Sequence, residues 1–135
     1  MTDPPRPLPA FDHETAGYFE AAGRGQLAVR VCSRCGETLH LPRSWCWRCR
    51  AGDTEWVEVS GRARLYSWTT VCQSLHPAFE TPYTVVLVEL EDRPGVRLAG
   101  MLPGEPELEA GMAMQVRFED LGDATLPQFV PAGDR

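Results

Sequence analysis

The sequence predicts a mostly β protein in which one short helix and a cysteine-rich segment precede five strands. Three observations lead to this prediction. No stretch reads as a long helix, β-rich runs alternate with turn residues through the C-terminal half, and two C-x-x-C pairs lie in the N-terminal half. The 135 residues are 43% hydrophobic and 24% charged, which is the composition of an ordinary globular domain.

The N-terminal residues predict an arm followed by a helix. Residues 1–10 contain four prolines and are expected to form a flexible arm. The helix is assigned to residues 11–24, with Asp12 as its N-cap and Gly23 as its C-terminal stop. An apolar stripe on this helix needs a surface to dock on, in this chain or in a partner, and it consists of Phe11, Tyr18 and Phe19.

Residues 25–55 are predicted to form a zinc ribbon. Each C-x-x-C pair is a tight turn that points two thiolates at one tetrahedral ion, and Gly36 suits the left-handed backbone of such a turn. Ten residues separate the pairs, enough for a two-stranded excursion over Thr38–Arg43. Four thiolates leave no coordination position for water or substrate, so the zinc is expected to be structural. The ligands are Cys32, Cys35, Cys46 and Cys49.

Other chemistry is compatible with the same four cysteines. An iron ion in a rubredoxin-like site uses the same ligand set. Two disulfides or free buried thiols are further alternatives. The fifth cysteine, Cys72, falls on a predicted strand and is expected to be a buried structural thiol, because no nucleophile motif surrounds it.

Residues 56–132 are predicted to form a five-stranded barrel of the oligonucleotide/oligosaccharide-binding (OB) type. The first strand is expected to be long and bent, running from Trp56 to Val71 with Gly61 at the bend. A small β-sandwich is the competing architecture. The remaining strands are expected at residues 83–91, 96–101, 112–118 and 128–130.

Charge and hydropathy narrow the classes of function. Residues 24–50 carry six arginines and one acid, a net charge of +5, whereas residues 51–135 carry six arginines and fourteen acids, a net charge of −8. An acidic barrel is a poor non-specific nucleic-acid binder, but the basic segment can hold a compact phosphorylated ligand or an acidic partner surface. No apolar run reaches the roughly 20 residues of a membrane span, and no secretory signal pattern is present. A cytoplasmic location is therefore expected.

The order of these segments resembles a known family. It is similar to the acyl-CoA-associated OB-fold proteins with an N-terminal rubredoxin-like zinc ribbon, long labelled domain of unknown function 35 (DUF35). The chain departs from that pattern at Trp47, where the family often has Pro, and at Arg50 and Ala63, where it often has Gly. The resemblance rests on both cysteine pairs and on residues 25–27, 41–43, 56–62, 65–69, 83–91, 111–116 and 129–131.

What the resemblance implies is a non-catalytic accessory subunit with no catalytic residues of its own. Such proteins work in a hetero-oligomer with a thiolase-fold enzyme: an acyltransferase, a thiolase or a retro-aldol aldolase, including those of steroid side-chain degradation. The thiolase-fold chain carries the chemistry, and the small subunit binds it and helps to shape the acyl-CoA site. Two alternatives are a stand-alone acyl-CoA-binding protein and, less favoured by the acidic barrel, a nucleic-acid-binding ribbon/OB module.

Two further groups of side chains are candidates for contacts. Guanidinium groups suit phosphate oxygens, so the ribbon arginines are candidates for the phosphates of coenzyme A or for a partner, with solvated surface as the alternative: Arg34, Arg43, Arg48 and Arg50. Aromatic side chains anchor protein interfaces and apolar chains, which makes four of them candidates for partner or acyl-chain contact: Trp47, Trp68, Tyr66 and Phe79. Strand alternation predicts that Tyr66 and Trp68 face away from Leu65 and Ser67.

Overall fold

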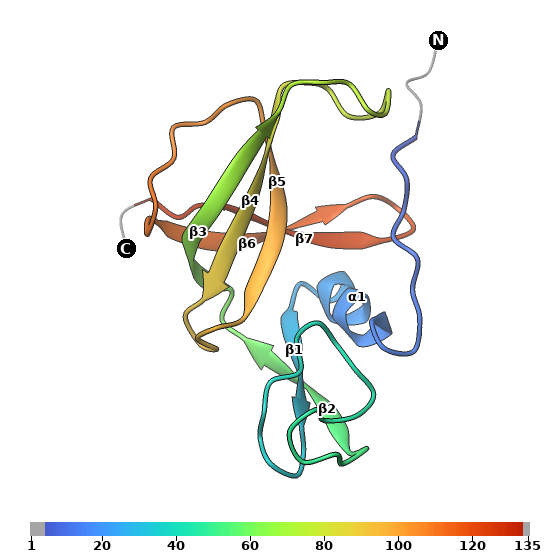
Figure 1. Ribbon diagram of the computed structural model, residues 1–135. Helices are drawn as coiled ribbons and strands as arrows, with labels where there is room; N and C mark the ends of the chain where they lie inside the picture. Colours follow the sequence, from blue (N-terminus) through green and yellow to red (C-terminus); the bar gives the residue numbers. More distant parts are fainter. Residues whose placement is uncertain (1–4, 134–135) are drawn as a thin grey trace.

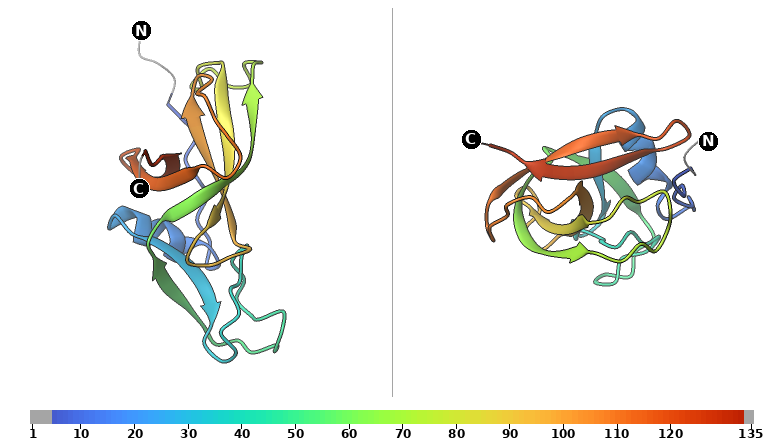
Figure 2. Two further views of the ribbon diagram at one scale, coloured as in Figure 1. Left: turned by 90° about the vertical axis from the view of Figure 1, so that its left-hand side faces the viewer. Right: turned by 90° about the horizontal axis from the view of Figure 1, so that it is seen from above.

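The computed structural model describes residues 5–133 and confirms the predicted fold class. One helix and a two-stranded sheet lie at one end of a five-stranded barrel (Figures 1 and 2). No helix among the described residues has the length and hydropathy needed to cross a membrane. The elements are α1 (Ala16–Gly23), β1 (Leu27–Cys32), β2 (Thr54–Val59), β3 (Arg62–Val71), β4 (Tyr83–Leu90), β5 (Arg97–Pro103), β6 (Ala113–Asp120) and β7 (Thr125–Pro131).

The five-stranded sheet closes on itself. Its strand order is β5-β4-β3-β6-β7, and every hydrogen-bonded pair of neighbours is antiparallel. The outer strands β5 and β7 meet through a side chain, because the backbone N–H of Met101 donates to Oε1 of Gln128 at 2.7 Å. Gly100 lies so close to β7 that an added Cβ would sit 3.0 Å from the backbone nitrogen of Phe129. The β5–β7 seam therefore depends on a glycine and one buried amide.

The strand that begins near Trp56 does not enter the barrel, which corrects the prediction of one long bent strand. β2 pairs with β1 along its whole length, from Leu27 opposite Val59 to Cys32 opposite Thr54. The chain then turns at Gly61, whose φ is 81°, and continues as β3 in the other sheet. The bend at Gly61 is confirmed, and it separates two sheets rather than two halves of one strand.

The two sheets nevertheless share one hydrophobic core. Leu27, Val29 and Val31 of β1 are buried in the same cluster as the barrel residues Leu65 and Phe129. On the helix, Gly17 lies against the indole of Trp56, where an added Cβ would overlap the ring. Helix, ribbon and barrel are thus packed as a single unit.

The helix begins at Ala16, and Thr15 rather than the predicted Asp12 is its N-cap residue. The Asp12 carboxylate accepts hydrogen bonds from the backbone N–H groups of Glu14 and Thr15, both at 2.9 Å. These bonds stabilise a turn ahead of the helix, which is the other common role of an aspartate side chain. The predicted arm over residues 1–10 is described from residue 5, and there Arg6 is anchored by Glu119 at 2.7 Å.

A bulge changes which side chains of β3 share a face. The register on β4 shifts between Leu65 and Ser67, so Tyr66 is the extra residue. Leu65 lies opposite Val88 and Trp68 opposite Val86, two positions apart on β4. Leu65 and Trp68 therefore project from the same face of the sheet, and the predicted alternation is wrong because the bulge interrupts it.

We expect Gly61→Ala to destabilise the protein by about 3 kcal/mol, because it adds left-handed strain to an overlap with Val116. Gly95→Ala is the matched control: its φ is 90°, but nothing lies within 4 Å of an added Cβ, so about 1 kcal/mol of strain is expected. Urea unfolding of both variants measures the two effects. Equal losses for both would show that the contact with Val116 does not matter.

Candidate metal centre

Two similar turns present the four cysteines. In the first, which follows β1, the backbone N–H of Gly36 donates to the carbonyl of Cys32 at 2.9 Å, and Gly36 has a φ of 82°. In the second, the N–H of Arg50 donates to the carbonyl of Cys46 at 3.0 Å, and Arg50 has a φ of 67°. Gly36 thus takes the left-handed conformation predicted for it, and Arg50 takes the same conformation without being glycine.

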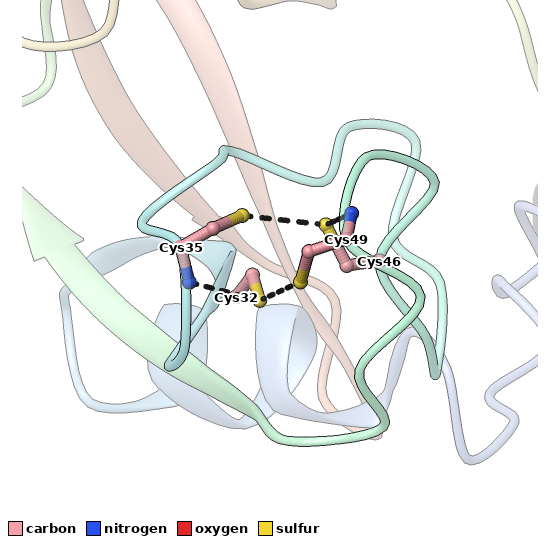
Figure 3. A group of neighbouring side chains, drawn as sticks. All are labelled: Cys32, Cys35, Cys46 and Cys49. Atoms are coloured by element: carbon pink, nitrogen blue, oxygen red, sulfur yellow. Dashed lines mark hydrogen bonds between the residues drawn. The ribbon is translucent and has the colours of Figure 1, made fainter.

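The four sulfur atoms converge on one point (Figure 3). The Sγ atoms of Cys32 and Cys49 are 3.6 Å apart, as are those of Cys35 and Cys46. All four lie within 4.8 Å of one another. A tetrahedral ion with bonds of about 2.3 Å to sulfur requires sulfur–sulfur distances of about 3.8 Å. The site can therefore hold one metal ion, with no position left for water or substrate.

Backbone N–H groups surround the sulfur atoms and shift their acidity. The N–H of Cys35 points at Sγ of Cys32 at 3.5 Å and lowers the pKa of Cys32 to about 7. Burial opposes ionisation of Cys46, but the N–H groups of Cys49 and Arg48 lower the pKa of that thiol overall.

Cys35 shifts in the opposite direction. The N–H of Glu37 lowers its pKa, but burial and the neighbouring thiol of Cys46 raise it further, to about 12. Four adjacent thiolates repel one another, so a bound cation is what allows all four to ionise together. The donor set therefore fits a metal ion.

The ribbon loops have only a small apolar core of their own. Their buried cluster consists of Cys32, Leu39, Cys46 and Ala51, with Cys49 packed against it. The predicted two-stranded excursion over Thr38–Arg43 is not formed, since Thr38 makes only an isolated bridge to Val31. The loop between the cysteine pairs is irregular, and the cysteines at its two ends and a few hydrogen bonds fix its course.

The predicted phosphate-binding arginines have different surroundings. Arg48 pairs with Glu37 at 3.1 Å, and Arg34 and Arg50 are exposed on the two cysteine turns. Arg43 lines a hollow in the loop between the cysteine pairs. The role predicted for the group stays a prediction, and Arg43 is its best-placed member.

The predicted aromatic contacts lie in three places. Trp47 lines the same hollow as Arg43. Tyr66 and Trp68 are exposed on β3, where Arg97 covers the Tyr66 ring at 3.8 Å. Phe79 is half-buried in the β3–β4 loop, with the Arg6 guanidinium 5.2 Å from its ring centre.

Sequence reasoning missed two features and misplaced a third. It did not associate Trp45 and Leu41 with a hollow, although the run of apolar side chains between the cysteine pairs was a usable signal. Nothing in the sequence indicated the Arg6 anchor. Cys72 is exposed rather than buried, because it falls just beyond the end of β3. The Nδ1 atom of His76 accepts the N–H of Ala78 at 3.0 Å, so it is engaged within its own loop.

A helix, a four-thiol ribbon and a closed five-stranded barrel around one core define a class of protein, the ribbon/OB-fold modules. Within it, this chain belongs to the ChsH2/DUF35 family. Residues 56–119 match the family described as the ChsH2 C-terminal OB-fold domain. A chain of the solved structure described as the "Ltp2-ChsH2(DUF35) aldolase" is 36% identical, with a TM-score of 0.85 over 93% of this chain and 99% of that one.

A more distant solved structure and two longer curated proteins are also similar to this chain. A DUF35-family protein of unknown function from Sulfolobus solfataricus shares the fold at 18% identity, with a TM-score of 0.58 over 82% of this chain and 80% of its own. The probable enoyl-CoA hydratase alpha subunit of Thermomonospora curvata is 37% identical over 94% of this chain and 40% of its own length. The 3-oxo-4,17-pregnadiene-20-carboxyl-CoA hydratase alpha subunit of Mycobacterium tuberculosis is 26% identical over 91% and 39%. This chain spans about two fifths of these curated relatives.

The metal site and the exposed thiol together predict the reactivity of the five cysteines. In the metal-loaded protein we expect one thiol, Cys72, to react rapidly with a disulfide reagent, because coordination protects the other four. Adding a chelator and denaturant should release the remaining four together with one equivalent of metal. Cys72→Ser should abolish only the fast reaction. Rapid reaction of several thiols before chelation would contradict the four-thiolate site.

We expect Arg50→Gly to stabilise the second cysteine turn by about 0.5 kcal/mol, because relief of left-handed strain exceeds the entropy cost of glycine. Competition with a chromophoric chelator measures the gain as tighter metal binding. Arg34→Gly in the first turn is the matched control; it relieves no such strain and should weaken binding. The interpretation fails if both variants weaken binding equally.

Proposed function

We propose that this chain is a non-catalytic accessory component of a thiolase-like acyl-CoA enzyme. The observation that carries the proposal is its likeness to the chain of the Ltp2–ChsH2(DUF35) aldolase, which extends over 99% of that chain. Acyltransferase, thiolase and retro-aldol aldolase are the reactions that the partner would perform.

The chemistry of the described residues favours an accessory role. The four grouped thiols form a closed coordination site, and the exposed Cys72 makes no hydrogen bond to His76 in the part of the chain that the structure describes. A nucleophile paired with a base is what independent acyl-transfer chemistry requires. On this proposal, the reacting groups belong to the partner.

The metal that fits the site best is zinc in a structural role. Zinc accepts four thiolates in a tetrahedral shell and needs no open position to stabilise a fold. The ribbon has only a small buried cluster of its own, so binding free energy becomes folding free energy for these loops. The four thiols stay reduced and available in a reducing compartment, for which we propose the cytoplasm.

The substrate class follows from the relatives. Both curated relatives are described by reactions on CoA thioesters, one of them with a steroid-type acyl group. We therefore propose an acyl-CoA shared between this chain and its partner. A steroid side chain is the more specific candidate, supported by a relative of 26% identity.

The exposed aromatic side chains of β3 are the proposed anchors for the partner. Only Arg62–Arg64 of β3 pair with β6, and the rest of β3 extends past the β6–β7 hairpin (Figures 1 and 2). Tyr66 and Trp68 are 51% and 41% exposed on that extension. Arg97 restrains the Tyr66 ring, so less side-chain entropy is lost when a partner binds.

The test is affinity purification of the tagged chain from its native host, with mass spectrometry and metal analysis of the eluate. A thiolase-fold chain in stoichiometric amount, together with one zinc per copy of this chain, is the expected result. Recovery without such a chain would contradict the accessory role. Acyl-CoA turnover or tight acyl-CoA binding by the isolated chain would favour a stand-alone protein, and co-purifying nucleic acid would favour the nucleic-acid module.

We expect Trp68→Ala to weaken binding of the recovered partner by roughly thirtyfold, because truncating an aromatic anchor typically costs about 2 kcal/mol. Leu75→Ala is the matched control: Leu75 is 75% exposed but was not among the predicted contacts. Biolayer interferometry with the purified partner measures both affinities. Equal affinities for wild type and Trp68→Ala would remove β3 from the proposed interface.

A further inference from the structure

The loop between the two cysteine pairs encloses a hollow that the metal site does not use. Its volume is about 490 Å³. Three of its lining side chains are large, apolar and exposed: Leu41 at 71%, Trp45 at 51% and Trp47 at 61%. The complete lining is Leu39, His40, Leu41, Arg43, Trp45 and Trp47.

The chemistry of the lining combines flat π surfaces with a cation. Within residues 5–133, no ring stacking occupies Trp45 or Trp47. The Arg43 side chain is 64% exposed, and its ion pair with Glu14 is long, at 3.9 Å. Indole faces stack on nucleobases, and a guanidinium group pairs with phosphate oxygens. Both kinds of contact are available from one hollow.

The walls of the hollow are held in place before any ligand binds. The Glu14 carboxylate accepts the backbone N–H and the hydroxyl of Ser44, both at 3.2 Å. Leu39 is fully buried, and its N–H donates to the carbonyl of Arg30 at 2.8 Å. Between the two tryptophans, Cys46 is fully buried, and its N–H donates to the carbonyl of Ala51 at 2.8 Å. Such preorganisation lowers the entropy cost of binding.

The charge distribution favours an anionic occupant. The hollow lies within residues 24–50, which carry a net charge of +5, while residues 51–135 carry −8. Burial lowers the pKa of His40, although a backbone hydrogen bond with Arg97 acts in the opposite direction, so burial disfavours the charged imidazole. Arg43 is the cation that a phosphate group would contact.

We propose that this hollow binds a phosphorylated purine nucleotide, whose base stacks on Trp45 and Trp47 and whose phosphate contacts Arg43. The choice of nucleotide rests on the proposed function. An acyl-CoA enzyme would present the adenosine 3′,5′-bisphosphate end of coenzyme A to this hollow. The acyl end would then extend toward the partner. Trp47, which departs from the proline frequent in the family, is central to this assignment.

The test is calorimetric titration of the isolated, metal-loaded chain with adenosine 3′,5′-bisphosphate. We expect saturable binding that Trp47→Ala weakens roughly tenfold or more, as the loss of one base–aromatic stack does. Arg43→Gln should weaken binding and reduce its dependence on salt. Leu75→Ala and Arg64→Gln, both outside the ribbon, are the matched controls and should bind as wild type does. Metal content and circular dichroism confirm that each variant is folded.

Four outcomes would overturn the assignment. These are no binding at millimolar nucleotide, equal binding of inorganic phosphate alone, tighter binding of a single-stranded oligonucleotide, and loss of partner binding rather than nucleotide binding on Trp47→Ala. The third would identify a nucleic-acid site and the last a protein interface. A chain that still recovers a thiolase-fold partner but ignores the nucleotide would disprove this inference alone. A chain that binds the nucleotide but recovers no such partner would disprove the proposed function alone.

Discussion

The convergence of four cysteine sulfurs is the constraint on which the ribbon depends. Those sulfurs join the end of β1 to a loop that has almost no core of its own. The pKa of Cys32 is lowered and that of Cys35 is raised, so neighbouring thiols oppose the ionisation of all four together. A bound ion turns four weak, competing groups into a rigid crosslink, and the loop that carries Trp45 and Trp47 inherits that rigidity.

The ribbon and the barrel are held rigidly together because the ribbon is not an independent domain. β1 contributes Leu27 and Val29 to the core that fills the barrel, so the two sheets are stabilised by the same burial of apolar surface. The glycine at position 61 makes this possible, since it lets the chain turn sharply between the sheets. A ribbon held in this way can present a surface at a fixed distance from the barrel.

Predictions from local sequence patterns succeeded where the pattern was uninterrupted and failed where a bulge or a strand end interrupted it. Cysteine spacing and left-handed glycine preference are local properties, and the four cysteines come together as expected. Strand alternation is local only until a bulge intervenes, and the bulge at Tyr66 reversed the predicted facing of Trp68. The assignment of Cys72 failed for a related reason, because strand ends are set by pairing with β4 rather than by propensity.

The sequence by itself therefore determined the order of helix, ribbon and five barrel strands, the grouping of four thiols and the bend at Gly61, because each depends on residue type and short spacing. Only the tertiary structure decided that β2 pairs with β1, that Arg6 reaches Glu119, and that Arg43 and Trp47 line one hollow. These features join residues through packing and long-range pairing. Many alternative pairings satisfy the same local pattern, and only the shared core selects among them.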